Sequence, residues 1–173
     1  MKLYKARIPA IAHDVIETLC NESAIEVAVE NRAEAEKDLV AILEEYMRRD
    51  TDLRESVREH MSTFSVPYNE FGKVRSQIAD RNGHPTGDEV QRYIARQCIE
   101  NFMISRFVDE VFAEDRELIK RVREIIEKYD VDEHALRTEA SEQIRNVTEG
   151  TVDYEIALSK AMRDVKKRHG LLT

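Results

Sequence analysis

Glycine, proline and tryptophan are scarce in this sequence of 173 residues, which has 5 glycines, 3 prolines and no tryptophan. Sandwiches and barrels need many tight turns, which glycine and proline form, so their scarcity argues against an all-β protein. Alanine, leucine, isoleucine, glutamate, lysine and arginine dominate instead, and these residues favour helices. The composition therefore predicts an all-α fold.

The signatures of common catalytic and cofactor sites are also missing. The sequence has no glycine-rich phosphate loop and no serine in a nucleophile-elbow context. Its five histidines are scattered, and no His-x-x-x-His, Cys-x-x-Cys or Glu-x-x-His motif occurs. We therefore expect a protein that is not an enzyme and that holds no metal or cofactor.

Long apolar runs are absent as well. No stretch approaches the roughly 18 apolar residues that a membrane-spanning helix needs, and the charged N-terminal segment lacks the apolar run of a signal peptide. The two cysteines, Cys20 and Cys98, lie among apolar helix residues and are expected to be buried thiols. These features predict a cytoplasmic protein without membrane insertion.

Acidic residues outnumber basic residues. The chain has 35 Asp and Glu against 27 Lys and Arg, which gives a formal net charge of −8. A surface of this sign repels phosphate backbones at long range, so nucleic acid is an unfavoured partner.

Identical residues recur at a spacing of 83 positions. Ile11 returns as Ile94, Tyr46 as Tyr129 and Leu53 as Leu136. A constant offset over this span indicates a duplicated helical unit. The turn-forming residues from 82 to 87 separate the copies. We predict a first repeat over residues 1–83, a linker over 84–87 and a second repeat over 88–173.

Each repeat is predicted to contain a short helix, a long helix and another short helix. The apolar residues of the long helix keep a seven-residue period from Leu39 to Phe64 and again from Val122 to Val147. We predict about six helices in two three-helix units, related by a pseudo-twofold axis and packed into one bundle. Segment 24–29 alternates weakly, which is typical of a short strand, but its counterpart 107–112 does not alternate, so we predict that both segments link helices.

Four polar residues, here called the polar seam, interrupt the seven-residue period at equivalent places. They are Asp50 and His60 in the first repeat and Glu133 and Gln143 in the second. Residues 50–52 and 130–132 are good helix N-caps, so we expect a kink that divides each long helix in two. The alternative is a buried acid that binds an arginine or a ligand.

Charged residues recur on the first helix of each repeat. His13 lies four residues before Glu17, and Arg96 lies four residues before Glu100. This spacing predicts an i,i+4 ion pair in both copies.

Basic residues gather at the two ends of the chain, and we call them the terminal basic cluster. They are Lys2, Lys5, Arg7, Arg163, Lys166, Lys167 and Arg168. Favourable charge at the C-terminal end of a helix explains the second group without any partner. If the two ends of the chain meet, the cluster is a candidate docking patch for an acidic protein or for RNA.

Four stretches carry a resemblance to a known family. They are residues 1–12, Ala24–Val27, Leu43–Tyr46 and Val111–Asp115. With these stretches the chain resembles, over nearly its whole length, an uncharacterised bacterial family described as domain of unknown function 507, in its longer form with two repeats. The resemblance implies a bacterial cytoplasmic protein and brings no catalytic residues.

The leading functional hypothesis is a non-enzymatic interaction or scaffold module that binds another protein. Helices with a seven-residue period often present grooves to partner helices, and homodimerisation through them is an equally physical outcome. A second hypothesis is a small RNA- or ribosome-associated factor that uses the terminal basic cluster. A third is an enzyme whose site is formed by the repeated acids Asp50 and Glu133.

Cutting the chain between Gly83 and His84 tests whether the repeats share a core. We expect the separate halves to be poorly folded or to dimerise, because each leaves an apolar edge uncovered. Circular dichroism and size-exclusion chromatography of each half measure this. Two well-folded monomeric halves would refute the shared core.

Overall fold

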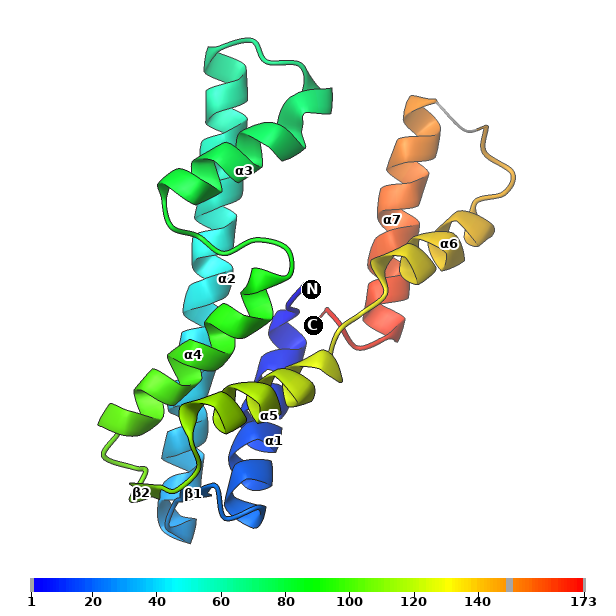
Figure 1. The fold of residues 1–173 in the computed structure, drawn as a ribbon. Helices are drawn as coiled ribbons and strands as arrows, with labels where there is room; N and C mark the ends of the chain where they lie inside the picture. Colours follow the sequence, from blue (N-terminus) through cyan, green and yellow to red (C-terminus); the bar gives the residue numbers. More distant parts are fainter. Residues whose placement is uncertain (1, 149–150, 173) are drawn as a thin grey trace. The chain divides into compact units, whose positions relative to one another are not determined.

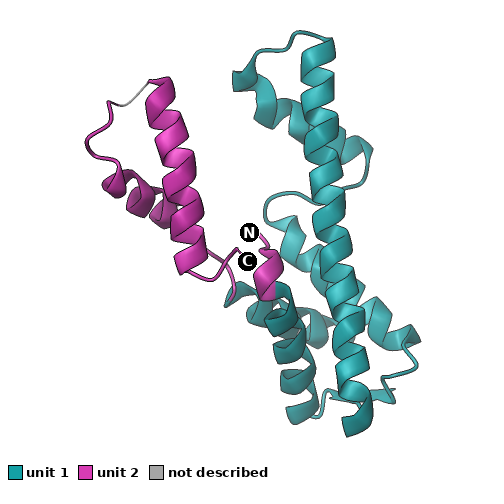
Figure 2. Ribbon diagram, turned by 180° about the vertical axis from the view of Figure 1, so that it is seen from behind, with its two compact units in different colours: residues 1, 8–128 teal, residues 2–7, 129–173 magenta. Residues whose placement is uncertain are grey.

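The computed structural model describes residues 2–148 and 151–172, and it confirms the all-α prediction (Figure 1). The described residues form seven α-helices, short 3-10 turns and two strands of two residues each. They divide into two compact units (Figure 2). Unit 1 contains residues 8–128, and unit 2 contains residues 2–7 and the chain from Tyr129 onward.

Unit 1 contains five of the helices and both strands. In chain order they are α1 (Ile8–Asn21), β1 (Ile25–Glu26), α2 (Arg32–Thr63), α3 (Phe71–Arg81), α4 (Glu89–Ile104), β2 (Glu110–Val111) and α5 (Asp115–Glu127), with 3-10 turns at Val29–Asn31 and Tyr68–Glu70. The 14 residues of α1 bury one apolar side, which includes Ile11, Val15 and Leu19. Residues three and four apart share a helix face, so this spacing places all three against the core.

The helices of unit 1 pack in a pattern that repeats. Helix α1 contacts α2 and α5, and α4 contacts α5 and α2. Exchanging α1 with α4, α2 with α5 and β1 with β2 leaves these contacts unchanged, as a pseudo-twofold axis requires. The strands pair antiparallel, with Ile25 opposite Val111 and Glu26 opposite Glu110. Segments 24–29 and 107–112 are both predicted to link helices, with a short strand as the alternative for 24–29, and each contributes a strand to this pair.

The second half of α2 packs on α3 around a smaller apolar cluster. Leu53, Val57 and Met61 of α2 meet Val74 and Ala79 there. Each fully buried Leu, Val or Met side chain of this kind contributes roughly 1.5–3 kcal/mol to stability.

Unit 2 has an equivalent helical hairpin. Helices α6 (Glu133–Gln143) and α7 (Val152–Arg168) pack around a cluster that includes Leu136, Ala140, Ala161 and Val165. Leu136 and Ala140 lie 83 positions after Leu53 and Val57 of the α2–α3 cluster. The boundaries of the two compact units differ from those of the predicted repeats. The repeats over residues 1–83 and 88–173, with a linker over 84–87, stay a prediction about a duplication in the sequence.

The N-terminal segment belongs to unit 2. Tyr4 is 6% exposed and joins the α6–α7 apolar cluster. Arg7, in the 3-10 turn Lys5–Arg7, donates a hydrogen bond from Nη2 to the carbonyl oxygen of His169 at 3.0 Å. Residues that precede α1 therefore help to hold the hairpin formed at the other end of the sequence.

The predicted kinks are found in one long helix only. Helix α2 continues through residues 50–52, so the kink predicted there is wrong. The long helix predicted for the second repeat is divided into α5 and α6, so the described residues form seven helices where about six were predicted. In the second copy Asp132 caps α6 by accepting hydrogen bonds from the amides of His134 and Ala135. In α2 both oxygens of Asp50 bind arginines, so this carboxylate does not cap a helix.

In the described part of the chain, every helix is too short or too polar to cross a membrane.

Replacing Tyr4 with Ala tests its place in unit 2. We expect a loss of about 3 kcal/mol of local stability, because a large buried side chain leaves a cavity. Hydrogen exchange of the amides in α6 and α7 measures it. Tyr68→Ala is the control, since Tyr68 is 83% exposed and its removal should change stability by less than about 0.5 kcal/mol. Unchanged protection in α6 and α7 would show that Tyr4 does not support the hairpin.

Candidate functional site

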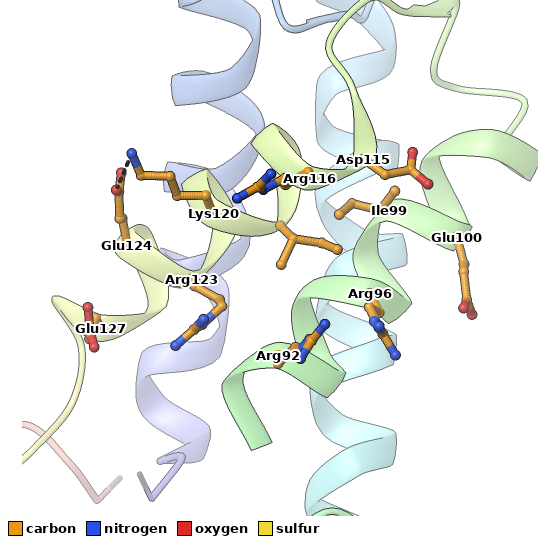
Figure 3. A pocket seen from close by; sticks show the side chains of 11 residues that line it. Arg92, Arg96, Ile99, Glu100, Asp115, Arg116, Lys120, Arg123, Glu124 and Glu127 are labelled. Carbon is orange, nitrogen blue, oxygen red and sulfur yellow. Dashed lines mark ion pairs between the residues drawn. The ribbon is translucent and has the colours of Figure 1, made fainter. Parts of the chain in front are cut away.

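A charged groove of about 880 Å³ runs between α4 and α5 within unit 1 (Figure 3). It is lined by Arg92, Arg96, Ile99, Glu100, Asp115, Arg116, Ile119, Lys120, Arg123, Glu124 and Glu127. Five of these residues are basic, four are acidic and two are isoleucines. We call this feature the α4–α5 groove.

Helix geometry explains why these side chains gather in the groove. On α4, Arg92 and Arg96 are one turn apart, and the core residues Ile94 and Cys98 lie on another face. On α5, the buried residues Leu118 and Val122 lie on one face. The groove residues between Arg116 and Arg123 lie on a neighbouring face of the same helix. The packing that buries one face of each helix thus turns its arginine face toward the groove.

The arginines of the groove lack acidic partners. Within the described residues, Arg92, Arg96, Arg116 and Arg123 form no ion pair. Lys120 differs, because its Nζ lies 3.8 Å from Glu124 Oε1. Arginine forks bind carboxylates and phosphates in a bidentate way, so four unpaired guanidinium groups form a site suited to anions.

The predicted i,i+4 ion pairs on the first helices are wrong in both copies. Glu100 accepts a hydrogen bond from Nε2 of Gln97 at 2.7 Å, which leaves Arg96 free to face the groove. In the first repeat, His13 binds Glu36 at 2.9 Å and Glu17 binds Arg32 at 2.7 Å. In the first repeat, contacts between α1 and α2 thus replace the predicted local pair, whereas in the second repeat a different contact within α4 replaces it.

Two isoleucines form the apolar part of the groove. Ile99 of α4 is 5% exposed, and Ile119 of α5 is partly buried. Both line the groove together with its charged residues, and Figure 3 labels Ile99. A ligand in this groove therefore meets apolar surface as well as charge.

The first repeat lacks this arrangement. Positions 83 residues before Arg92, Arg96 and Arg123 hold Pro9, His13 and Val40. The sequence carried one signal of the groove, namely basic residues spaced three and four apart on two successive helices. This spacing alone does not predict a groove, because whether the two helices face each other depends on their packing.

A second hollow of about 500 Å³ adjoins the groove, since Arg92 and Arg96 line both. His84 also lines it, with a side chain that is 3% exposed. The His84 ring stacks on Tyr46 with ring centroids 5.3 Å apart. Its Nε2 lies 3.6 Å from Asp50 Oδ1 and makes no hydrogen bond. Burial lowers the pKa of His84, although Asp50 opposes this shift.

Asp50 of the polar seam is tied to basic residues. Its side chain is 14% exposed and binds Arg75 of α3 at 2.8 Å and Arg54 at 2.7 Å. For Asp50 the structure thus matches the second interpretation of the polar seam, in which a buried acid binds an arginine, and not the helix kink. Burial, followed by the charge of Asp50, raises the pKa of the neighbouring Tyr46 to about 12.

The other seam residues have partners within their own compact units. His60 is half-buried and packs on Phe64, with ring centroids 4.6 Å apart. Glu133 lies in unit 2 and binds Lys2 at 3.2 Å and Lys166 at 3.3 Å. Gln143 is exposed and donates a hydrogen bond to the carbonyl oxygen of Glu139 at 3.4 Å. Each repeated acid, Asp50 and Glu133, therefore binds a cation from the last helix of its own repeat.

The structure brings the terminal basic cluster together within unit 2, where acids neutralise part of it. Lys2 and Lys166 share Glu133, and Arg168 binds Glu139 at 3.0 Å. Desolvation, the largest cause, lowers the pKa of Lys2. The remaining members of the cluster are Lys5 and Arg7 in the N-terminal 3-10 turn and Arg163 and Lys167 on α7.

No group of three or more His, Cys, Asp or Glu residues in the described ranges 2–148 and 151–172 could hold a metal ion.

Comparison with known proteins adds a family and no chemistry. The model of the family described as "Protein of unknown function (DUF507)" matches residues 1–171 of the chain. A search among curated proteins finds no match.

The pKa of His13 should lie above the ordinary histidine value of 6.5, and the pKa of His84 should lie below it. The hydrogen bond to Glu36 raises the pKa of His13, and burial lowers that of His84. The unfolded chain then takes up a proton that native His84 does not, so His84 should reduce stability as the pH falls below about 6.5.

An NMR titration of the histidine ring protons measures both pKa values. Asp50→Asn should lower the pKa of His84 further, because the Asp50 charge favours the protonated ring. A His84 pKa above that of His13 would contradict the burial seen in the structure.

Proposed function

We propose that this chain, which belongs to the family of proteins of unknown function DUF507, is a non-enzymatic interaction module that binds an acidic segment of another protein in the α4–α5 groove. One observation carries the proposal. Four arginines of the groove form no ion pair within the described residues, although acidic residues outnumber basic ones and the net charge is −8. An acidic partner would supply the missing carboxylates.

The mixed lining of the groove favours a protein over a nucleic acid. Glu100, Asp115 and Glu127 line the groove beside the arginines and would repel a continuous phosphate backbone. Ile99 and Ile119 offer apolar surface, which suits a side chain of a protein partner. Protein interfaces commonly combine a small apolar centre, arginine and a polar rim.

The chemistry of the lining supports binding rather than catalysis. All the described lining residues are Arg, Lys, Asp, Glu or Ile, so the groove wall contains no hydroxyl, thiol or imidazole. Hydroxyl and thiol groups are common enzyme nucleophiles and imidazole is the most frequent proton-transfer group, so only lysine and carboxylates remain for such roles in the described lining. The charged residues of this groove instead fit recognition of charge.

We place this module in the bacterial cytoplasm. Cys20 and Cys98 are both free, which fits a reducing compartment. Burial raises the pKa of the Cys98 thiol to about 12, so this thiol stays protonated and behaves as a small apolar side chain.

A second candidate is an RNA-associated role for the terminal basic cluster of unit 2. It is favoured by Arg163 and Lys167, which form no ion pair within the described residues. Glu133 and Glu139 lie among the neighbouring cations and weaken their attraction for phosphate.

In-cell photo-crosslinking tests the proposal. A photoreactive residue replaces Lys120 at the groove, and the control carries it at Lys37, which lies 83 positions earlier in the first repeat. We expect a discrete protein adduct from position 120 only. Arg92→Glu with Arg123→Glu should reduce that adduct at least about tenfold, because acidic partners would then be repelled.

Three outcomes would contradict the proposal. They are an adduct with RNA that ribonuclease removes, an adduct with a second copy of this chain, and equal protein adducts from positions 120 and 37. Both substituted arginines are exposed, so the double variant should keep its fold, which its helical circular dichroism checks.

A further inference from the structure

We propose that Arg92 and Arg96 of α4 and Arg123 of α5 form a subsite for a phosphoryl group at the end of the α4–α5 groove. The subsite deepens the proposed function. It rests on that function in one respect only, namely that a protein segment would carry the phosphoryl group. Its own basis is the placement of three unpaired guanidinium groups from two helices around one part of the groove (Figure 3).

Arg92 and Arg96 stand where two depressions meet. Both side chains line the α4–α5 groove and also the adjoining 500 Å³ hollow. Figure 3 shows their head groups side by side, with Arg123 across the groove on α5. An anion at this junction can therefore be approached by forks from both helices.

The number of unpaired charges selects phosphate over carboxylate. These three arginines form no ion pair within the described residues, so one bound carboxylate would leave most of their charge uncompensated. A phosphoryl group carries a charge of about −1.5 to −2 at pH 7 and three acceptor oxygens. Planar guanidinium forks match those oxygens in a bidentate way.

Acids at both ends of α5 limit the size of the anion. Asp115 begins α5 and Glu127 ends it, and both line the groove. They flank Arg123 and its neighbours along the helix. These carboxylates would repel a phosphate chain that extended along the whole of α5, which favours an anion confined to the neighbourhood of the three arginines.

The fold itself supplies a comparison. The positions equivalent to the three arginines in the first repeat hold Pro9, His13 and Val40. The same helix pair therefore exists in unit 1 without the subsite. The arginines are a property of the second copy and not a requirement of the α1–α2 or α4–α5 packing.

The hollow beside the subsite leaves two sources for the phosphoryl group. A phosphorylated protein segment would extend along the groove over Ile99 and Ile119. A small phosphorylated molecule would extend into the hollow toward Tyr93 and His84. The shared chemistry is the phosphoryl group, and the experiment separates the sources.

NMR titration of the full chain tests the subsite, with inorganic phosphate, acetate and a short acidic peptide in phosphoserine and serine forms as probes. We expect shifts of the Arg92, Arg96 and Arg123 Nε–H signals, and binding of phosphate at least about tenfold tighter than acetate at equal ionic strength. The triple variant R92Q/R96Q/R123Q should lose this binding. The matched triple variant R58Q/R81Q/R106Q, which removes three exposed arginines elsewhere in unit 1, should keep it.

The peptide pair identifies the source. Tighter binding of the phosphoserine peptide than of inorganic phosphate would support a protein source, and equal binding would support a small molecule. Equal affinity for phosphate and acetate, or equal losses in the two triple variants, would overturn the subsite. Such a failure would leave the proposed function standing if the crosslinked protein adduct still depended on Arg92 and Arg123.

Discussion

The burial of α1 and α4, the first helices of the two repeats, is the interaction on which the other features of unit 1 depend. Each packs on α2 and α5, and the two short strands pair beside them. Because the apolar faces of α4 and α5 are used for this packing, their other faces remain open to solvent. The exposure of the groove arginines is therefore a consequence of the packing of the apolar faces of α4 and α5 in the core.

Acidic residues in this protein have two different roles, which depend on whether they form an ion pair with a basic residue of a neighbouring helix. Asp50 and Glu133 occupy equivalent places, and each holds a cation from the last helix of its repeat, Arg75 or Lys166. These ties join helices within each hairpin. In the groove the balance is reversed, because its acids leave four arginines unpaired among the described residues. A surplus of acids over the whole chain thus coexists with a local surplus of free guanidinium groups.

The sequence was sufficient for what depends on local spacing. The all-α fold, the buried stripe of α1 and the cap at Asp132 follow from periodicity and capping chemistry. The continuity of α2 could not be predicted, because Arg75 lies 25 residues from the carboxylate that it binds. The groove could not be predicted for the same reason, since facing arginines on two helices become one site only when tertiary packing brings the helices together.

The central claim is that the groove arginines are free to bind an external anion. A crystal structure of the full chain grown with tungstate, a phosphate mimic with strong anomalous scattering, tests it directly. The account predicts an anomalous peak within hydrogen-bond distance of the Arg92 and Arg96 guanidinium groups. Peaks confined to the terminal basic cluster, with the groove arginines bound to Glu100, Asp115 or Glu127, would contradict it.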